Sequence, residues 1–187
     1  MIVVKKRMSD ENLIPVEIYS AKWDDRWKRN VTPWDLGEPA PILVQLFQQN
    51  TLGSSGVAFV PGCGTGYEVT WIGTFANWSA VGMDISETAV QVAKARRDSL
   101  GIDPARAEIL LGDFFTHERQ YDLVFDHLFL CALQPKSRLD WARQIAQLVK
   151  PGGILIAYMY PINTHTDGML MINSSDRPPF CSQSRHI

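Results

Sequence analysis

The chain has 187 residues and a mass of 21.1 kDa, which is the size of one domain. It carries 18 basic and 20 acidic side chains, and this near balance (net charge -2) gives no support to binding of nucleic acid or of an anionic membrane. The three cysteines lie far apart without metal-ligand spacing, which argues against a disulfide scaffold and against a zinc module.

The apolar segments of the chain predict a cytosolic domain. Only a short apolar patch precedes Lys5 and Lys6 at the N-terminus, so no signal peptide is predicted. The longest apolar stretch, residues 152–162, is too short to span a bilayer. We therefore expect one globular domain in the cytosol, preceded by a loosely held arm over residues 1–17.

Two helices are predicted before the first strand. Within residues 18–30, Trp23 and Trp27 lie four positions apart and share one face of a helix. A Thr-Pro-Trp-Asp segment that contains Trp34 then interrupts the pattern, because proline restricts the residue before it. Residues 40–50 have apolar side chains at helical spacing, which predicts an amphipathic helix that begins near Pro39.

The rest of the chain alternates apolar runs with helical patterns. Strands are predicted over residues 57–60, 79–84, 107–115, 121–130 and 154–160, and helices over residues 66–75, 86–100 and 136–149. The strands are hydrophobic almost throughout, which is typical of a parallel sheet covered on both faces. The predicted fold is a doubly wound α/β domain with about five strands, and its ligand should bind at the carboxyl ends of the strands.

Glycines directly follow the first predicted strand, in the sequence Gly62-Cys63-Gly64-Thr65-Gly66. They allow a tight turn and a close approach of a ligand to the backbone. Asp84 ends the second strand about 20 residues later, where a carboxylate can bind both ribose hydroxyls of an adenosine ligand. Two plainer interpretations remain open: a strand-to-helix turn without a ligand, and an Asp84 that only caps the next helix.

Two further strand ends carry polar side chains. Asp113 could accept from an adenine amino group and Phe114 could lie against the ring, or they could be a solvated loop residue and a core residue. Asp126 and His127 follow the fourth strand, where Asp126 is expected to point at the pocket near the reacting centre. His127 is interpreted either as a polar contact or acid/base group, or as a structural histidine.

The glycine spacing narrows the choice of adenosine ligand. The pattern is GxGxG rather than the GxGxxG of dinucleotide-binding domains, and no Gly-Lys-Ser/Thr follows, so a P-loop is absent. Neither cysteine in the described motifs is expected to be a nucleophile. Cys63 and Cys131 are interpreted as small packing residues.

At this point the residues resemble a known family. The segments VPGCGTGYEV, GMDIS, GDFF, YDLVFD and LVKPGGILI resemble the successive motifs of class I S-adenosylmethionine-dependent methyltransferases. The segments KWDDRWKRNVTPWDLGEPAPILVQL and FDHLFLCALQPKSRLDWARQIAQLVKPGG are similar to the thiopurine methyltransferase-like family, and most similar to its plant-type thiol and halide/thiocyanate methyltransferases, of the "harmless to ozone layer" type. The resemblance covers residues from about 18 to 165.

The resemblance implies a Rossmann-like fold, S-adenosyl-L-methionine as the methyl donor and S-adenosyl-L-homocysteine as its product. It implies a small soft acceptor (a thiol, bisulfide, thiocyanate or a halide) and an in-line methyl transfer without a metal. The expected oligomeric state is a monomer. The implied cofactor contacts are Trp23, Trp27, Trp34, Gly62, Gly64, Asp84, Asp113, Phe114 and His127. Trp23 and Trp27 have a second interpretation, since they could simply attach the N-terminal segment to the domain. His127 stands where the plant proteins usually have an aromatic residue.

The C-terminal residues depart from the family pattern. The family's domains end with a helix and an antiparallel hairpin, whereas residues 166–187 are predicted to form an irregular tail. On this basis the sequence suggests a missing hairpin and an alternative or frameshifted ending. A second hypothesis follows, that of a truncated inactive or regulatory isoform, and a third is a non-catalytic module that binds an adenosine ligand.

Overall fold

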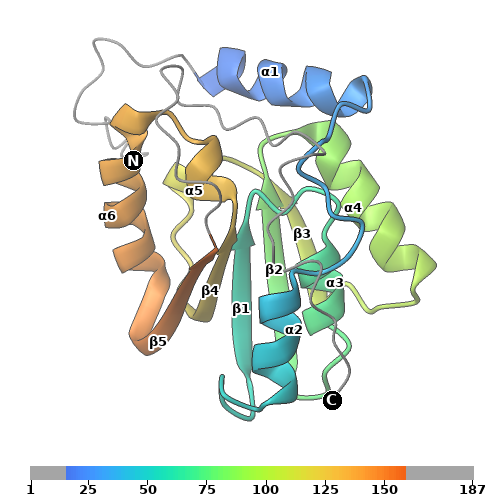
Figure 1. Ribbon diagram of the computed structural model, residues 1–187, viewed down its shortest axis with the longest axis vertical. Helices are drawn as coiled ribbons and strands as arrows, with labels where there is room; N and C mark the ends of the chain where they lie inside the picture. The colour runs from blue at the N-terminus through green and yellow to red at the C-terminus, as the bar shows by residue number, and fades with distance from the viewer. Residues whose placement is uncertain (1–15, 159–187) are drawn as a thin grey trace, which may run out of the picture.

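The computed structural model describes residues 16–158, and these form a sheet of five parallel strands with helices on both faces (Figure 1). The strands are β1 (Gly56–Pro61), β2 (Trp78–Asp84), β3 (Ala107–Leu111), β4 (Tyr121–His127) and β5 (Val149–Tyr158). The helices are α1 (Val16–Lys28), α2 (Pro41–Gln48), α3 (Tyr67–Ile72), α4 (Glu87–Ser99), α5 (Phe129–Ala132) and α6 (Arg138–Leu148). The strand order β3-β2-β1-β4-β5 confirms the predicted doubly wound fold.

The sheet separates two hydrophobic clusters. One lies under α2, α3 and α4 and includes Leu43, Val60 and Ile72, all essentially inaccessible to solvent. The other lies under α6 and includes Phe59 and Leu148, which are likewise inaccessible. Neighbouring residues of one strand reach different clusters because successive side chains of a strand point to opposite faces. Burial on both faces explains why these strands are apolar throughout.

Among the strands, β3, β4 and β5 differ most in their bounds from those predicted. β3 ends at Leu111, and the following residues turn into a short 3₁₀ helix, Phe114–Thr116, rather than extending the strand to residue 115. β4 ends at His127 rather than residue 130, because Leu128 adopts a left-handed φ of 65° and starts α5. β5 begins at Val149, ahead of the predicted start at residue 154, and Gly152 has a φ of 78° that only glycine adopts readily.

Helix α1 lies across the carboxyl ends of the strands (Figure 1). Three side chains attach it there: the Tyr19 hydroxyl donates to the Ala132 carbonyl at 2.7 Å, and the Ser20 hydroxyl donates to the Ile85 carbonyl at 3.0 Å. Asp24 accepts hydrogen bonds from the Ser86 hydroxyl at 2.8 Å and from the Thr88 amide at 2.9 Å. The helix therefore covers the edge of the sheet at which a ligand is expected.

Some predictions lie outside the described residues. These are the arm up to residue 15, the irregular tail over 166–187 and the missing hairpin; the last two residues of the predicted arm begin α1. Within residues 16–158, β5 forms one edge of the sheet and exposes Ile154 and Leu155 in part. None of the helices in this range is long and apolar enough to cross a membrane.

Candidate functional site

The glycine loop between β1 and α3 has the backbone that its sequence predicts. Gly62, Gly64 and Gly66 have φ angles of 59°, 51° and 76°, in the left-handed region that disfavours a side chain. The Gly66 amide donates to the Cys63 carbonyl at 2.8 Å and closes the turn. A Cβ atom on Gly62 would lie 2.5 Å from Cδ2 of Phe129, so the loop is also packed too closely for any side chain there.

Asp84 ends β2 beside this loop. Its Oδ2 accepts from the Gly64 amide at 3.0 Å and its Oδ1 accepts from the Ser86 amide at 2.9 Å. Burial raises the pKa of Asp84 above its ordinary value, against the lowering effect of the Ser86 and Gly64 amides. A carboxylate has about four acceptor positions, so these two bonds leave capacity for hydroxyl donors of a ligand. The interpretation of Asp84 as the cap of the next helix is wrong: Ser86 is the N-cap of α4, and its hydroxyl accepts from the Ala89 amide at 3.1 Å.

The three tryptophans gather on one side of the loop. Trp27 is buried and packs on the backbone of Gly64: a Cβ atom there would lie 3.1 Å from its Cζ2. Trp34 meets Trp27 and Trp23 edge-on, with ring centroids 6.3 and 5.4 Å apart. The Arg26 guanidinium lies 5.6 Å from the Trp23 ring centre and 5.8 Å from that of Trp34. Both rings therefore already face a cation, as expected for indole faces.

A second link joins the Thr-Pro-Trp-Asp segment to the glycine loop. The Thr65 hydroxyl donates to Asp35 Oδ2, and the Gly37 amide donates to Asp35 Oδ1 at 2.8 Å. The Asp35 amide in turn donates to the Thr32 carbonyl at 3.0 Å. These bonds hold Trp34 against the site.

A small pocket of about 60 Å³ lies where these segments meet. Its lining comes from Trp27 of α1, residues 34–36 and Glu38 of the following loop, Val60, residues 62–65 of the glycine loop, Tyr67 and Glu68 of α3, and His127 and Leu128 after β4. The pocket thus contains Trp27, Trp34, Gly62, Gly64 and His127 of the predicted contacts. Trp23, Asp84, Asp113 and Phe114 are not among its lining residues.

The structure separates Asp126 from His127, since neighbours in a strand point to opposite faces. His127 faces α3, and its Nδ1 lies 2.8 Å from Glu68 Oε1. Asp126 faces α6 and is fully buried; its Oδ2 accepts from Trp141 Nε1 at 2.8 Å and its Oδ1 from the Leu130 amide at 3.1 Å. Burial raises its pKa to about 6. The prediction that Asp126 points at the pocket is therefore wrong.

Asp113 and Phe114 have local partners. Asp113 Oδ1 accepts from the Phe115 amide at 3.0 Å at the start of the 3₁₀ helix. Phe114 is 4% exposed, and its ring centroid lies 4.9 Å from that of Phe129 in the cluster under α6. These contacts match the structural interpretation that the sequence left open, and a role of either residue toward a cofactor remains a prediction.

The thiol of Cys63 lines the pocket. Cys63 is buried in the glycine loop, and burial raises the pKa of its thiol well above the usual value. Reaction as a thiolate is therefore disfavoured. Within residues 16–158, no group of three or more His, Cys, Asp and Glu side chains is arranged to hold a metal ion.

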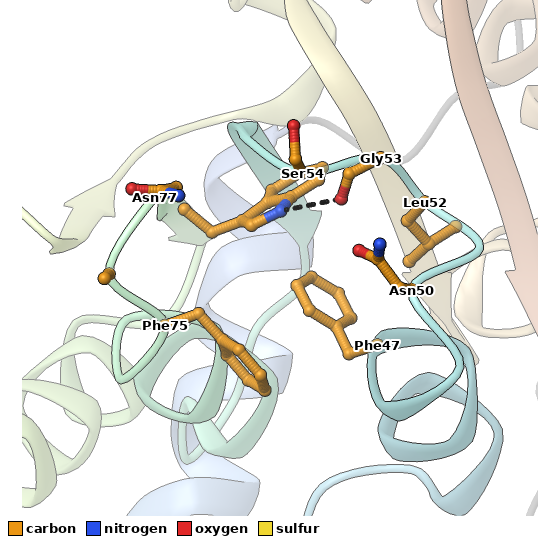
Figure 2. A pocket seen from close by; sticks show the side chains of 9 residues that line it. Phe47, Asn50, Leu52, Gly53, Ser54, Phe75 and Asn77 are labelled. Atoms are coloured by element: carbon orange, nitrogen blue, oxygen red, sulfur yellow. Dashed lines mark hydrogen bonds between the residues drawn. The ribbon is translucent and has the colours of Figure 1, made fainter.

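A second pocket, of about 140 Å³, lies at the opposite end of the strands, where β1 and β2 begin. Figure 2 shows its side chains, among them Phe47, Phe75 and Asn77, and the hydrogen bond from the Trp78 indole to the Gly53 carbonyl at 3.4 Å. Aromatic rings and amide groups line it, and none of its lining residues within 16–158 has a titratable side chain. The glycine-loop pocket is the better candidate for a site of chemistry, because Glu68 and His127 line it.

Three residues of this region were not identified from the sequence: Asp24, Asp35 and Glu68. Asp24 directly follows Trp23 and Asp35 directly follows Trp34. Acidic residues are ordinary in helices and turns, so neither carboxylate was distinctive in the sequence. Glu68 follows the glycines in the first turn of α3, where an acidic residue is ordinary. What distinguishes Glu68 is its burial, since only 6% of its side chain is exposed. Burial of a single side chain cannot be read from the sequence.

The sequence of the chain is similar to those of known proteins. Residues 18–176 match the family model of thiopurine S-methyltransferase (TPMT). A probable thiol methyltransferase 2 of Arabidopsis thaliana is 40% identical over 151 residues, and thiocyanate methyltransferase 1 of Brassica oleracea is 36% identical over 171 residues. These matches cover 80% and 84% of this chain and 66% and 74% of the two relatives. The chain thus spans about two thirds to three quarters of the length of these plant proteins.

A solved structure also shares the fold. It comes from work on the conversion of a disulfide bond into a thioacetal group during echinomycin biosynthesis. It superimposes with a TM-score of 0.65 at 23% sequence identity, over 73% of this chain and 58% of the other. At this identity the likeness establishes the architecture alone.

Proposed function

The chain belongs to the thiopurine S-methyltransferase family, and we propose from this that it is an S-adenosyl-L-methionine-dependent methyltransferase. Its acceptor would be a small soft nucleophile: a thiol, bisulfide, thiocyanate or a halide. The plant relatives named for thiol and thiocyanate methylation support this acceptor class. The single structural observation that carries the proposal is the pocket that joins the glycine loop, two tryptophans and His127 at the carboxyl ends of the strands.

The residues around Asp84 fit the donor. The glycine loop brings backbone close to the pocket without side chains, and Asp84 holds that backbone through the Gly64 amide while keeping acceptor capacity for ribose hydroxyls. Trp27 and Trp34 line the pocket, and aromatic rings there would attract a positively charged sulfonium. S-adenosyl-L-methionine supplies a methyl group that is already activated for transfer.

The protein's own contribution would be position and exclusion of water. Because the donor is activated, alignment of the acceptor with the methyl carbon is the main requirement. Helix α1 covers the site through Tyr19, Ser20 and Asp24 and limits access of water. The proposal assigns residues 18–165 to the methyltransferase domain and describes it as a cytosolic monomer.

The experiment is a methyl-transfer assay with the 187-residue chain. Methyl-labelled S-adenosyl-L-methionine is incubated with thiocyanate, bisulfide, iodide and ethanethiol in turn, and both S-adenosyl-L-homocysteine and the methylated product are measured. Acceptor-dependent turnover is expected, and binding of S-adenosyl-L-homocysteine is measured in parallel by isothermal titration. Binding without turnover of any acceptor would favour the inactive-isoform hypothesis, and absence of both would contradict the proposal.

A matched pair of variants links the activity to the site. Asp84→Ala removes the carboxylate beside the glycine loop and should abolish most turnover. Glu118→Ala removes an exposed carboxylate from the loop that precedes β4, at the other end of the sheet, and should leave turnover unchanged. Equal activity of both variants would remove the glycine-loop pocket as the site.

A further inference from the structure

The Glu68–His127 pair lies in the pocket, where His127 is also one of the predicted cofactor contacts. The Nδ1 of His127 is 2.8 Å from Glu68 Oε1, and this oxygen also accepts from the Ala40 amide at 3.1 Å. Only 12% of the histidine side chain and 6% of the glutamate side chain are exposed. Glu68 is therefore fixed by α2 and holds the imidazole ring in one orientation.

The hydrogen bond determines which ring nitrogen carries the proton. A carboxylate oxygen accepts, so the proton of a neutral imidazole lies on Nδ1. The Nε2 atom then presents a lone pair. Nε2 is buried and has no hydrogen-bond partner among residues 16–158. Buried polar atoms are nearly always paired, so an unpaired one beside a pocket calls for a partner that arrives with a ligand.

We propose that His127 is the base that takes the proton of a thiol acceptor, and that Glu68 is the residue that positions it. This inference rests on the proposed function and narrows its acceptor to a sulfur nucleophile that still carries a proton. Alkyl thiols are mostly protonated at neutral pH and must lose that proton to react, whereas iodide and thiocyanate have none to lose. A general base in the pocket serves only the first class.

The step balances in atoms and electrons. The thiol proton moves to His127 Nε2 as the sulfur lone pair forms a bond to the methyl carbon. The bond between that carbon and the donor sulfur breaks, and its electron pair stays on the donor sulfur as a neutral thioether. The products are the methyl thioether, S-adenosyl-L-homocysteine and a proton, which the ring releases to solvent afterwards.

The surroundings of the ring favour this transfer. Asp35 and Glu38 of the loop before α2 line the same pocket, and their negative charges stabilise the positive charge that the ring gains. Tyr67 and Cys63 line it as well, and burial raises the pKa of both. The Tyr158 ring of β5 lies 5.5 Å from the imidazole, and Asp126 points to the other face of the sheet. No lysine or arginine is among the described lining residues.

The test compares acceptors in three variants. His127→Gln and Glu68→Gln should each lower kcat/KM for ethanethiol by about 100-fold at neutral pH, the usual contribution of a general base. In both variants the loss for iodide should be at least about tenfold smaller than the loss for ethanethiol, because iodide has no proton to give to a base. Glu118→Gln, an exposed control, should change neither. The ethanethiol defect should shrink as the pH rises toward the thiol's own pKa, because the free thiolate needs no base.

Several results would overturn the inference. An equal loss of kcat/KM for ethanethiol and iodide would show that the Glu68–His127 pair has a structural role. No loss for either acceptor would show that the pair takes no part in the reaction. A second measurement does not require turnover, and it therefore tests the inference even if the chain methylates none of these acceptors. In the histidine-labelled chain with S-adenosyl-L-homocysteine bound, the His127 Nε2 resonance should shift on addition of ethanethiol. An unchanged resonance would overturn the inference whether or not the proposed methyl transfer occurs.

Discussion

The carboxylate of Asp84 accepts a hydrogen bond from the backbone amide of Gly64, 3.0 Å away and 20 residues earlier in the chain. This bond joins the glycine loop that follows β1 to the last residue of the neighbouring parallel strand, β2. It gives the glycine loop a defined shape before any ligand binds. Loop shape and ligand affinity should therefore depend on the same oxygen atoms.

Asp84→Asn should weaken binding of S-adenosyl-L-homocysteine by about tenfold or more. An asparagine keeps the size of the side chain but replaces one acceptor oxygen with a donor, and a hydrogen bond to a charged group contributes about 1.5–3 kcal/mol. The measurement is isothermal titration, with Glu118→Gln as the control for loss of an exposed carboxylate. An unchanged affinity would remove Asp84 from the cofactor site.

Gly64→Ala should lose both stability and ligand affinity. An alanine at a φ of 51° costs about 1–2 kcal/mol, and its Cβ would lie 3.1 Å from Trp27, which must shift. Gly101→Ala is the matched control, because Gly101 has a φ of 65° and nothing within 4 Å of an added Cβ.

The two glycine variants share the backbone strain, but Gly64→Ala should unfold at the lower urea concentration because it alone displaces Trp27. Only Gly64→Ala should bind S-adenosyl-L-homocysteine more weakly. If both variants retained the affinity of the unaltered protein, the contact between Trp27 and Gly64 would have no part in the site.

Asp24→Ala should loosen helix α1. Burial opposes the charge of Asp24, but hydrogen bonds from Lys28, Thr88 and Ser86 outweigh it and hold its pKa well below the ordinary value. A carboxyl group with a lowered pKa stabilises the fold above its unfolded-state pKa, and this contribution is lost as the pH falls. Removing the side chain should cost about 2 kcal/mol, or about 4–8 °C in Tm.

The neighbouring Asp25 is the control for this helix. Its side chain is 61% exposed and pairs with Arg29, 70% exposed, at 3.3 Å. Asp25→Ala should therefore change the free energy of unfolding by less than about 0.5–1 kcal/mol. Tryptophan fluorescence should also shift in Asp24→Ala alone, because α1 carries Trp23 and Trp27. Equal effects of the two variants would contradict the role given to Asp24.

Asp126 should make stability fall as the pH rises. Burial raises its pKa to about 6 from an ordinary 3.8, so between these values the folded state binds more protons than the unfolded state. Relative to Asp126→Asn, the free energy of unfolding of the unaltered protein should decrease by on the order of 3 kcal/mol between pH about 4 and pH about 7. Urea titrations of both proteins give this difference, and a difference independent of pH would contradict the prediction.

The architecture was predictable because its signals are local. Glycines that follow a buried apolar run, as at Gly62 and Gly64, report backbone geometry directly, and five apolar runs separated by helical patterns indicate a parallel sheet. Element ends were less predictable. Nothing in Leu128 itself indicates its left-handed φ of 65°, which depends on packing around it.

The site was predictable only in part, for a geometric reason. Asp126 and His127 are adjacent in sequence, and both looked like pocket residues, but the phase of β4 sends one toward α6 and the other toward α3. The partner of His127 lies 59 positions away, so no spacing rule identifies Glu68. Pairings of this kind depend on register, which a single sequence does not display.

The attachment of α1 also bears on how the protein is made. Its hydrogen bonds reach forward along the chain by 62 positions from Asp24 to Ser86, and by 113 from Tyr19 to Ala132. The helix leaves the ribosome before any strand does, yet its contacts are complete only when Ala132 of α5 has emerged. Contacts of such long separation are slow to close. During synthesis the tryptophans of α1 therefore stay exposed to solvent at first. The pocket is completed only after β1 to β4 have been translated.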